Sequence, residues 1–129
     1  MSFAEGGDWV LNGTKHFISH ADIADFAIVF MASGEEETPR GRKKRITAFF
    51  VDKGTPGFTV EEPYDKLGWH ISDTHGLSFD GCRVPADHLV GTEGQGFRQL
   101  MATFESARIQ TAARACGVAQ AAIRANPWS

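Results

Sequence analysis

The stretch of sequence that decides the fold is Trp9-Val10-Leu11-Asn12-Gly13-Thr14-Lys15-His16-Phe17-Ile18-Ser19. Asn12-Gly13 lies between two apolar-rich runs, and both residues tolerate the positive φ angles that a type I′ turn requires. This combination is the strongest short-range signal for a β-hairpin. The pattern therefore predicts two strands that meet at a turn formed by Asn12 and Gly13.

The strand expected after this turn alternates between two faces. One face carries Thr14, His16 and Ile18, and the other carries Lys15, Phe17 and Ser19. A flat ring lying on Phe17 would place its edge near the Ser19 hydroxyl, which can donate a hydrogen bond to a ring nitrogen. In the alternative interpretation, Phe17 and Ser19 are ordinary strand residues that pack against their neighbours.

The motif Asn12-Gly13-Thr14-Lys15-His16-Phe17-Ile18-Ser19 resembles a segment of the acyl-CoA dehydrogenases. Their middle domain carries Asn-Gly-x-Lys-x-Trp-Ile followed by Thr or Ser. In that family the aromatic residue covers the flavin of FAD, and the hydroxyl bonds near flavin N5. The resemblance implies FAD as cofactor and Phe17, Ile18 and Ser19 as cofactor-binding residues, with Phe17 in place of the usual Trp.

The resemblance extends from Asp8 to about Ala122, which is nearly the whole chain. Five further segments follow in the family's order and at about its spacing, and they are residues 46–51, 53–58, 66–74, 79–85 and 94–97. Any one of these segments is a weak signal. Together with the first motif they make the assignment strong.

Length and composition place the 129 residues, 42% hydrophobic and 22% charged, among globular chains of one domain with at most an appended element. A net charge of -3 disfavours a dominant role in binding nucleic acid or anionic membranes. Cys82 and Cys116 lack metal-ligand spacing and are interpreted as reduced thiols, which favours a cytoplasmic location. The sequence has neither a secretory signal pattern nor a run of about eighteen apolar residues, so no membrane span is predicted.

Short strands separated by turn signals, including Asp80-Gly81, fill the chain up to Gly91. Residues 33–45 are expected to form a charged, solvated loop at a hairpin tip. The spacing predicts a mainly β fold, an antiparallel β-barrel of orthogonally packed sheets. From Gln95 to Ala125 helical spacing without proline predicts one long C-terminal α-helix, which Asn126-Pro127-Trp128-Ser129 stops.

The resemblance divides the chain into two parts. Residues 1–92 correspond to the middle β-barrel domain, and residues 93–129 correspond to a truncated C-terminal helical domain, of which the first helix is present. The helix segment Phe104-Glu105-x-x-Arg108 matches the family segment that lines the acyl-CoA site. Phe104, Glu105 and Arg108 are therefore implied to bind substrate. Alternatively, Glu105 and Arg108 form only an (i, i+3) pair on the helix surface.

The implied activity is α,β-dehydrogenation of an acyl-CoA thioester with hydride transfer to flavin N5. No catalytic base is identifiable, because Ala107 occupies the place where a minority of the family carries the glutamate and most members carry it farther downstream. The chain is therefore expected to be a portion of an FAD-dependent acyl-CoA dehydrogenase that is inactive alone. Acyl-CoA and, for the full-length family, an electron-transferring flavoprotein are the implied partners. A homo-oligomer through the apolar C-terminal helix is expected.

Two other functions stay open on these residues. One is a non-catalytic module that binds flavin or acyl-CoA, and the other is a β-barrel that binds single-stranded nucleic acid through residues 40–45. His70, beside Trp69, is expected near the cofactor or acyl-CoA. No metal site is predicted, because the spacing of the histidines and nearby aspartates fits no standard zinc signature. These residues are His16, His20, His70, His75, His88, Asp22 and Asp73.

Overall fold

The structure is a computed structural model that describes residues 2–5, 7–39 and 41–126. Arg40 of the basic run and residues 127–129, where the helix is expected to stop, lie outside the described residues. The chain divides into two compact units, Met1–Phe97 and Arg98–Ser129. The first unit holds the strands, and the second holds most of the long helix.

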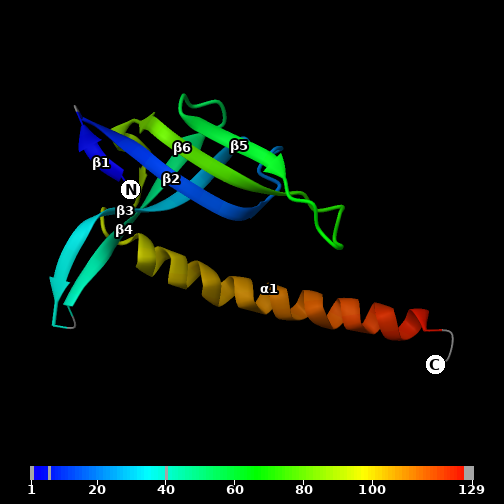
Figure 1. Cartoon of the computed structure of the whole chain (residues 1–129). Helices are drawn as coiled ribbons and strands as arrows, with labels where there is room; N and C mark the ends of the chain where they lie inside the picture. Colours follow the sequence, from blue (N-terminus) through cyan, green and yellow to red (C-terminus); the bar gives the residue numbers. More distant parts are fainter. Residues whose placement is uncertain (1, 6, 40, 127–129) are drawn as a thin grey trace. The chain divides into compact units, whose positions relative to one another are not determined.

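Two antiparallel sheets make up the first unit (Figure 1). The strands are β1 (Ser2–Glu5), β2 (Asp8–Ser19), β3 (Phe26–Thr38), β4 (Gly41–Asp52), β5 (Phe58–Pro63), β6 (Thr74–Val84) and β7 (Leu89–Val90). One sheet has the order β1-β2-β6-β5 and the other the order β3-β4-β7. A short 3-10 helix, η1 (Ala86–His88), precedes β7. The predicted fold class, antiparallel β-structure followed by one long helix, is confirmed.

A hydrophobic core joins the two sheets. Its buried side chains come from β2, β3, β4 and β6 and from the turn after β2, and they are Leu11, Ala21, Val29, Met31, Phe49, Val51, Leu77, Phe79, Cys82 and Val84. Phe49 is fully buried, and the ring of Trp9 packs on it with a centroid separation of 5.1 Å. Trp9 belongs to β2 and Phe49 to β4, so this contact ties one sheet to the other.

The predicted hairpin at Asn12-Gly13 is wrong, because both residues lie inside the continuous strand β2. Leu11 pairs with Cys82 and Gly13 pairs with Phe79, so Asp80 and Gly81 together oppose Asn12. The predicted turn at Asp80-Gly81 is therefore a β-bulge in β6, where Gly81 takes the left-handed conformation with φ 57°. Asn12 Oδ1 accepts a hydrogen bond from the Gly81 N–H at 2.8 Å, which holds the bulge in place.

The charged segment 33–45 is not a loop for most of its length. Strands β3 and β4 continue pairing through it, with Glu35 opposite Lys44, Glu36 opposite Lys43 and Glu37 opposite Arg42, and the turn joins Thr38 to Gly41. Opposite charges across an antiparallel pair support this register. The glutamates also offset the positive field of the described basic residues, which counts against the nucleic-acid interpretation.

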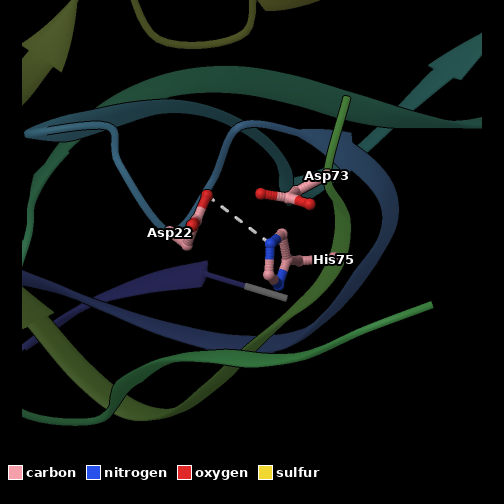
Figure 2. Close-up of side chains that lie close together, drawn as sticks. All are labelled: Asp22, Asp73 and His75. Atoms are coloured by element: carbon pink, nitrogen blue, oxygen red, sulfur yellow. Dashed lines mark ion pairs between the residues drawn. The ribbon is translucent and has the colours of Figure 1, made fainter. Parts of the chain in front are cut away.

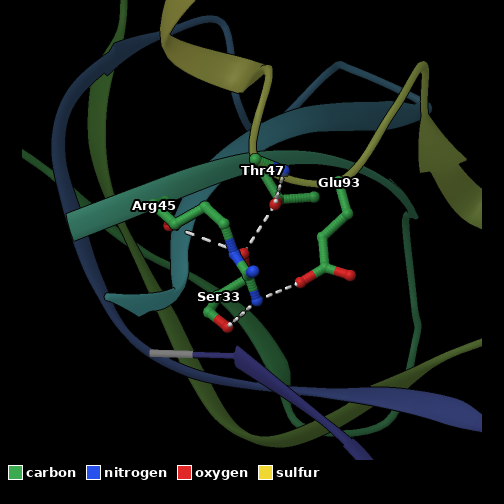
Figure 3. Close-up of polar contacts among 5 residues, drawn as sticks. Ser33, Arg45, Thr47 and Glu93 are labelled. Atoms are coloured by element: carbon green, nitrogen blue, oxygen red, sulfur yellow. Dashed lines mark hydrogen bonds and ion pairs between the residues drawn. The ribbon is translucent and has the colours of Figure 1, made fainter. Parts of the chain in front are cut away.

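The turn before the long helix is attached to β3 and β4 by a polar network (Figure 3). Arg45 Nη2 donates to Glu93 Oε1 at 2.5 Å, and the Gly94 N–H donates to Thr47 Oγ1 at 2.8 Å. The hydroxyls of Thr47 and Ser33 share a hydrogen bond of 2.7 Å. This network fixes the point from which the helix starts.

The helix α1 (Gly96–Ala125) confirms the predicted helix to within one residue at its start. Gly96 is buried against β4, and a Cβ atom there would lie 2.9 Å from the Ile46 carbonyl oxygen. Residues 108–126 are all exposed. Within the described residues, no helix combines the length and apolar character needed to cross a bilayer.

Candidate functional site

Phe17 lies at a second irregularity of β2, where the alternation of faces breaks. Lys15 pairs with Leu77 and Ile18 pairs with His75, so β2 advances three residues while β6 advances two. Phe17 takes the extra position with a φ of 60°, a left-handed conformation that is costly for a bulky residue. The predicted alternation, which put Lys15 and Phe17 on one face of the strand and Ile18 on the other, is therefore wrong here. Ile18 follows Lys15 on the inner side and packs against the core, while 77% of Phe17 is exposed.

An aromatic cluster surrounds Phe17. The ring centroids of Phe17 and Tyr64 are 5.4 Å apart, and His16 Nδ1 lies 2.7 Å from the Tyr64 hydroxyl oxygen in a hydrogen bond. Tyr64 follows β5 directly, and its N–H donates to the Thr74 carbonyl at 2.8 Å. These contacts hold the Phe17 ring at the surface with much of it uncovered, which suits it to support a flat ligand ring.

Ser19 supplies a hydrogen-bonding group two residues farther along β2. It pairs with Thr74 in the ladder, and its side chain is exposed. The Ser19 hydroxyl forms no hydrogen bond with any residue that the structure describes, so its donor is available to a ligand. Phe17, Ile18 and Ser19 therefore have distinct surroundings, because Ile18 points to the core and the other two are open to solvent.

Ser19 also lines an apolar cavity of about 330 Å³ in the first unit. The cavity is lined by Lys15, Ile18, Ser19, Ala21, Ala24, Phe26, Ala27, Ile28, Val29, Phe30, Lys53, Phe58, Val60 and Leu77. A largely apolar cavity with a few polar groups is typical of small-molecule sites. Ser19 is one of the few polar residues among those that line the cavity.

Lys15 is one of the two lysines that line this cavity, and the other is Lys53. The Lys15 Nζ donates a hydrogen bond to the Phe30 carbonyl at 2.6 Å, which connects β2 to β3. Desolvation by burial lowers the pKa of Lys15 from its ordinary value of 10.5. Folding at neutral pH therefore carries the cost of partly burying a charged group.

We expect the stability difference between the wild-type chain and Lys15→Met to depend on pH. Between the lowered pKa and 10.5, the unfolded chain holds the Lys15 proton more tightly than the folded chain. The unfolding free energy of the wild type therefore rises relative to Lys15→Met as the pH increases through this window. Urea denaturation at a series of alkaline pH values measures the difference. Lys44→Met, at an exposed position, is the matched control, and a difference for Lys15→Met that does not change with pH would contradict the prediction.

The three candidate substrate-binding residues lie on α1. Phe104, Glu105 and Arg108 are all exposed. In the described part of the chain, Glu105 and Arg108 form no ion pair within 4.0 Å, so the simple (i, i+3) pair is not formed. Their charged groups are therefore free to meet a ligand or another segment of protein.

The segment 66–72, which begins two residues after Tyr64, carries further exposed apolar side chains. Leu67 and Ile71 are almost fully exposed, and Trp69 is 59% exposed with a left-handed φ of 62°. The Lys66 ammonium holds the segment by donating to the Ser72 carbonyl and to Thr74 Oγ1. His70 belongs to the same exposed segment. Several exposed apolar side chains in one short segment indicate a surface that contacts a ligand or another protein segment.

Comparisons with known proteins agree on one family. The profile described as "Acyl-CoA dehydrogenase, middle domain" matches residues 2–82. The short-chain specific acyl-CoA dehydrogenase of Megasphaera elsdenii is 42% identical over 119 residues, which cover 92% of this chain and 30% of that protein. The chain thus spans about three tenths of the length of this curated relative.

Solved structures agree with the sequence relatives. The butyryl-CoA dehydrogenase of Megasphaera elsdenii has a TM-score of 0.84 and 40% identity, and the match covers 95% of this chain and 31% of that one. A glutaryl-CoA dehydrogenase of Mycobacterium smegmatis, solved in complex with FADH2, has a TM-score of 0.61 and 34% identity over 74% of this chain and 22% of that one.

Proposed function

The chain belongs to the acyl-CoA dehydrogenase family, and on this premise we propose that it is a portion of an FAD-dependent acyl-CoA dehydrogenase. Residues 1–92 supply the middle β domain, and residues 93–129 begin the C-terminal helical domain. The reaction is removal of the α proton and β hydride of an acyl-CoA thioester. The relatives of known structure that support this proposal include one bound to FADH2.

The segment Phe17-Ile18-Ser19 fits the isoalloxazine ring of FAD. FAD supplies an acceptor for the hydride when it is bound. Phe17 supports one face of the ring, Ser19 donates a hydrogen bond to its edge, and Ile18 anchors the strand between them in the core. The observation that carries the proposal is the left-handed, 77% exposed Phe17 held at the surface beside Tyr64.

Phe104, Glu105 and Arg108 are proposed to contact the acyl-CoA substrate. An unpaired guanidinium such as that of Arg108 suits recognition of anionic or carbonyl groups. Ala107 provides no general base, and the chain alone is expected to give no dehydrogenase turnover. An electron-transferring flavoprotein is proposed as the electron acceptor of the whole enzyme. The exposed apolar residues of α1, among them Ile109, Val118 and Ile123, support association of copies through this helix, which sedimentation analysis would test.

A non-catalytic module that binds flavin or acyl-CoA is the second candidate function. The absence of a base at Ala107 is compatible with it, and the flavin surface would then serve binding alone. The two candidates differ in the sequence expected downstream in the same reading frame. A downstream sequence that encodes the remaining helices of the family would favour the dehydrogenase.

We expect Phe17→Ala to weaken FAD binding by the 129-residue chain by about tenfold. This corresponds to roughly 1.4 kcal/mol, which is the order of a single aromatic stacking contact. Ser19→Ala should weaken binding by about threefold to tenfold through loss of one hydrogen bond. Quenching of flavin fluorescence on titration with protein measures both effects.

Phe97→Ala is the matched control, because Phe97 is another exposed phenylalanine of the first unit, with 48% of its surface open, but it contacts Lys43 instead of Tyr64. It should leave FAD binding unchanged. Phe17→Trp, which restores the family's larger ring, should strengthen binding. Equal binding by wild type, Phe17→Ala and Ser19→Ala would contradict the proposed flavin surface.

A further inference from the structure

A separate cluster of metal-ligating side chains lies where the turn after β2 meets the start of β6. Asp22, Asp73 and His75 each direct one ligand atom to a common space, and these atoms all lie within 4.8 Å of one another (Figure 2). Asp22 comes from the turn, Asp73 immediately precedes β6, and His75 is the second residue of β6. Sequence spacing carries no signal for this cluster, because the fold brings together residues about fifty positions apart.

His75 is the residue that distinguishes this cluster from an ordinary acidic surface. Its side chain is 4% exposed, and its Nδ1 lies 2.8 Å from the Glu61 carbonyl oxygen. A carbonyl only accepts, so Nδ1 must carry the proton and donate it. The lone pair of a neutral imidazole is then on Nε2.

The buried Nε2 atom has no hydrogen-bond partner among the described residues. It lies 3.5 Å from Asp22 Oδ1, in the direction of both aspartates. A buried nitrogen without a partner is costly and calls for an explanation. Histidines that bind metals commonly donate their other ring N–H to a backbone carbonyl, which fixes the tautomer as it is fixed here.

We propose that Asp22, Asp73 and His75 form a binding site for a divalent cation of the Zn²⁺ class. One imidazole nitrogen and two carboxylate oxygens suit Zn²⁺, with a water in the fourth position. Tetrahedral ligands about 2.0–2.2 Å from zinc lie roughly 3.3–3.6 Å from one another, close to the 3.5 Å between His75 and Asp22. Asp73 is exposed and can turn toward the other two ligands.

The charges around the cluster favour a cation. The hollow that contains it is lined by the carboxylates of Asp22, Glu61, Glu62 and Asp73 and by one ammonium, that of Lys53. Lys53 donates to the Asp22 backbone carbonyl at 2.5 Å, and so leaves the Asp22 carboxylate available. The Glu61 carboxylate accepts from Ser78 at 2.5 Å and has its own partner.

A bound cation would connect the turn after β2 to β6 beside the flavin-facing end of β2. The same two segments are already joined by the His20 N–H, which donates to the Asp73 carbonyl at 3.1 Å. Binding to the folded chain alone raises its stability by mass action. Zn²⁺ should therefore raise the melting temperature of the chain.

The test is calorimetric titration of the untagged 129-residue chain with ZnCl₂, together with thermal melts. We expect one equivalent of Zn²⁺ to bind saturably, Asp73→Asn to weaken binding at least tenfold, and His75→Gln to abolish it. Asp73→Asn changes an exposed residue and keeps the fold, so it decides the question if the buried His75→Gln variant fails to fold. His70→Gln and Asp65→Asn, which change exposed residues outside the cluster, should bind as the wild type does.

Three results would overturn the proposed site. One is the absence of saturable binding by the wild-type chain, which would leave His75 and Asp22 as a simple ion pair. Another is Zn²⁺ binding by Asp73→Asn as tight as that of the wild type. The last is an equal loss in the His70→Gln control.

Discussion

Gly57→Ala is expected to destabilise the chain by about 3 kcal/mol. Gly57 has a φ of 82°, and a Cβ atom there would lie 2.3 Å from the Asp80 carbonyl oxygen and 2.9 Å from the Cys82 nitrogen. Both are backbone atoms of β6, so no side chain can move aside. The left-handed conformation costs about 1 kcal/mol for alanine, and displacing the backbone costs about 2 kcal/mol more. The midpoint of urea denaturation measures the sum.

Gly54→Ala separates the two contributions to this cost. Gly54 also has a φ of 82°, but a Cβ atom there would meet nothing within 4 Å. Its substitution should therefore cost only about 1 kcal/mol, the conformational part. Similar losses at both glycines would show that the close approach to β6 contributes nothing, and that the Gly57 prediction is wrong.

The Gly57 contact matters for the fold because it faces the bulge in β6. The Asp80 N–H donates to the Gly57 carbonyl at 2.9 Å, and Gly81 completes the bulge opposite Asn12. The turn before β5 and the bulge in β6 therefore contact each other through backbone atoms. A substitution that moves either one disturbs the register between β2 and β6, which positions Phe17.

The strands and the helix were predictable because their signals are local. The apolar runs 26–32 and 46–51 mark β3 and β4, and helical spacing without proline marks α1. Periodicity of this kind reports which residues share a face within one element. The family resemblance was also carried by contiguous motifs, and the matching profile and relatives confirmed it.

The bulges were not predictable because they depend on the partner strand. Asn12-Gly13 has the composition of a turn, yet β6 pairs with residues on both sides of it and β2 continues. The same is true at Phe17, where a register shift against β6 moves the ring to the surface. The contact of Tyr64 with Phe17 and the pairing of His75 with Asp22 join residues distant in sequence, which a single sequence does not reveal.

Phe49→Ala is expected to cost about 3–5 kcal/mol, at least as much as the substitution at Gly57. Phe49 is fully buried and packs against Trp9 across the two sheets, so alanine would leave a cavity at their junction. Phe26→Ala is the matched control on the neighbouring strand. Phe26 is 51% exposed, and its ring stacks on that of Phe50 with a centroid separation of 4.8 Å, so its loss should cost about 1 kcal/mol.

The Phe49 substitution also tests how the core supports the flavin surface. Trp9 and Phe17 lie on the same strand, so loosening the sheets at Trp9 should weaken FAD binding in proportion to the loss of folded chain. Titration with FAD at urea concentrations below and within the unfolding transition distinguishes loss of folded chain from a change in the geometry of the Phe17 surface. If Phe49→Ala weakened FAD binding while the chain was still fully folded, the core would act on the Phe17 surface through local geometry. If Phe49→Ala cost no more than Phe26→Ala, the two sheets would not depend on this contact for their packing.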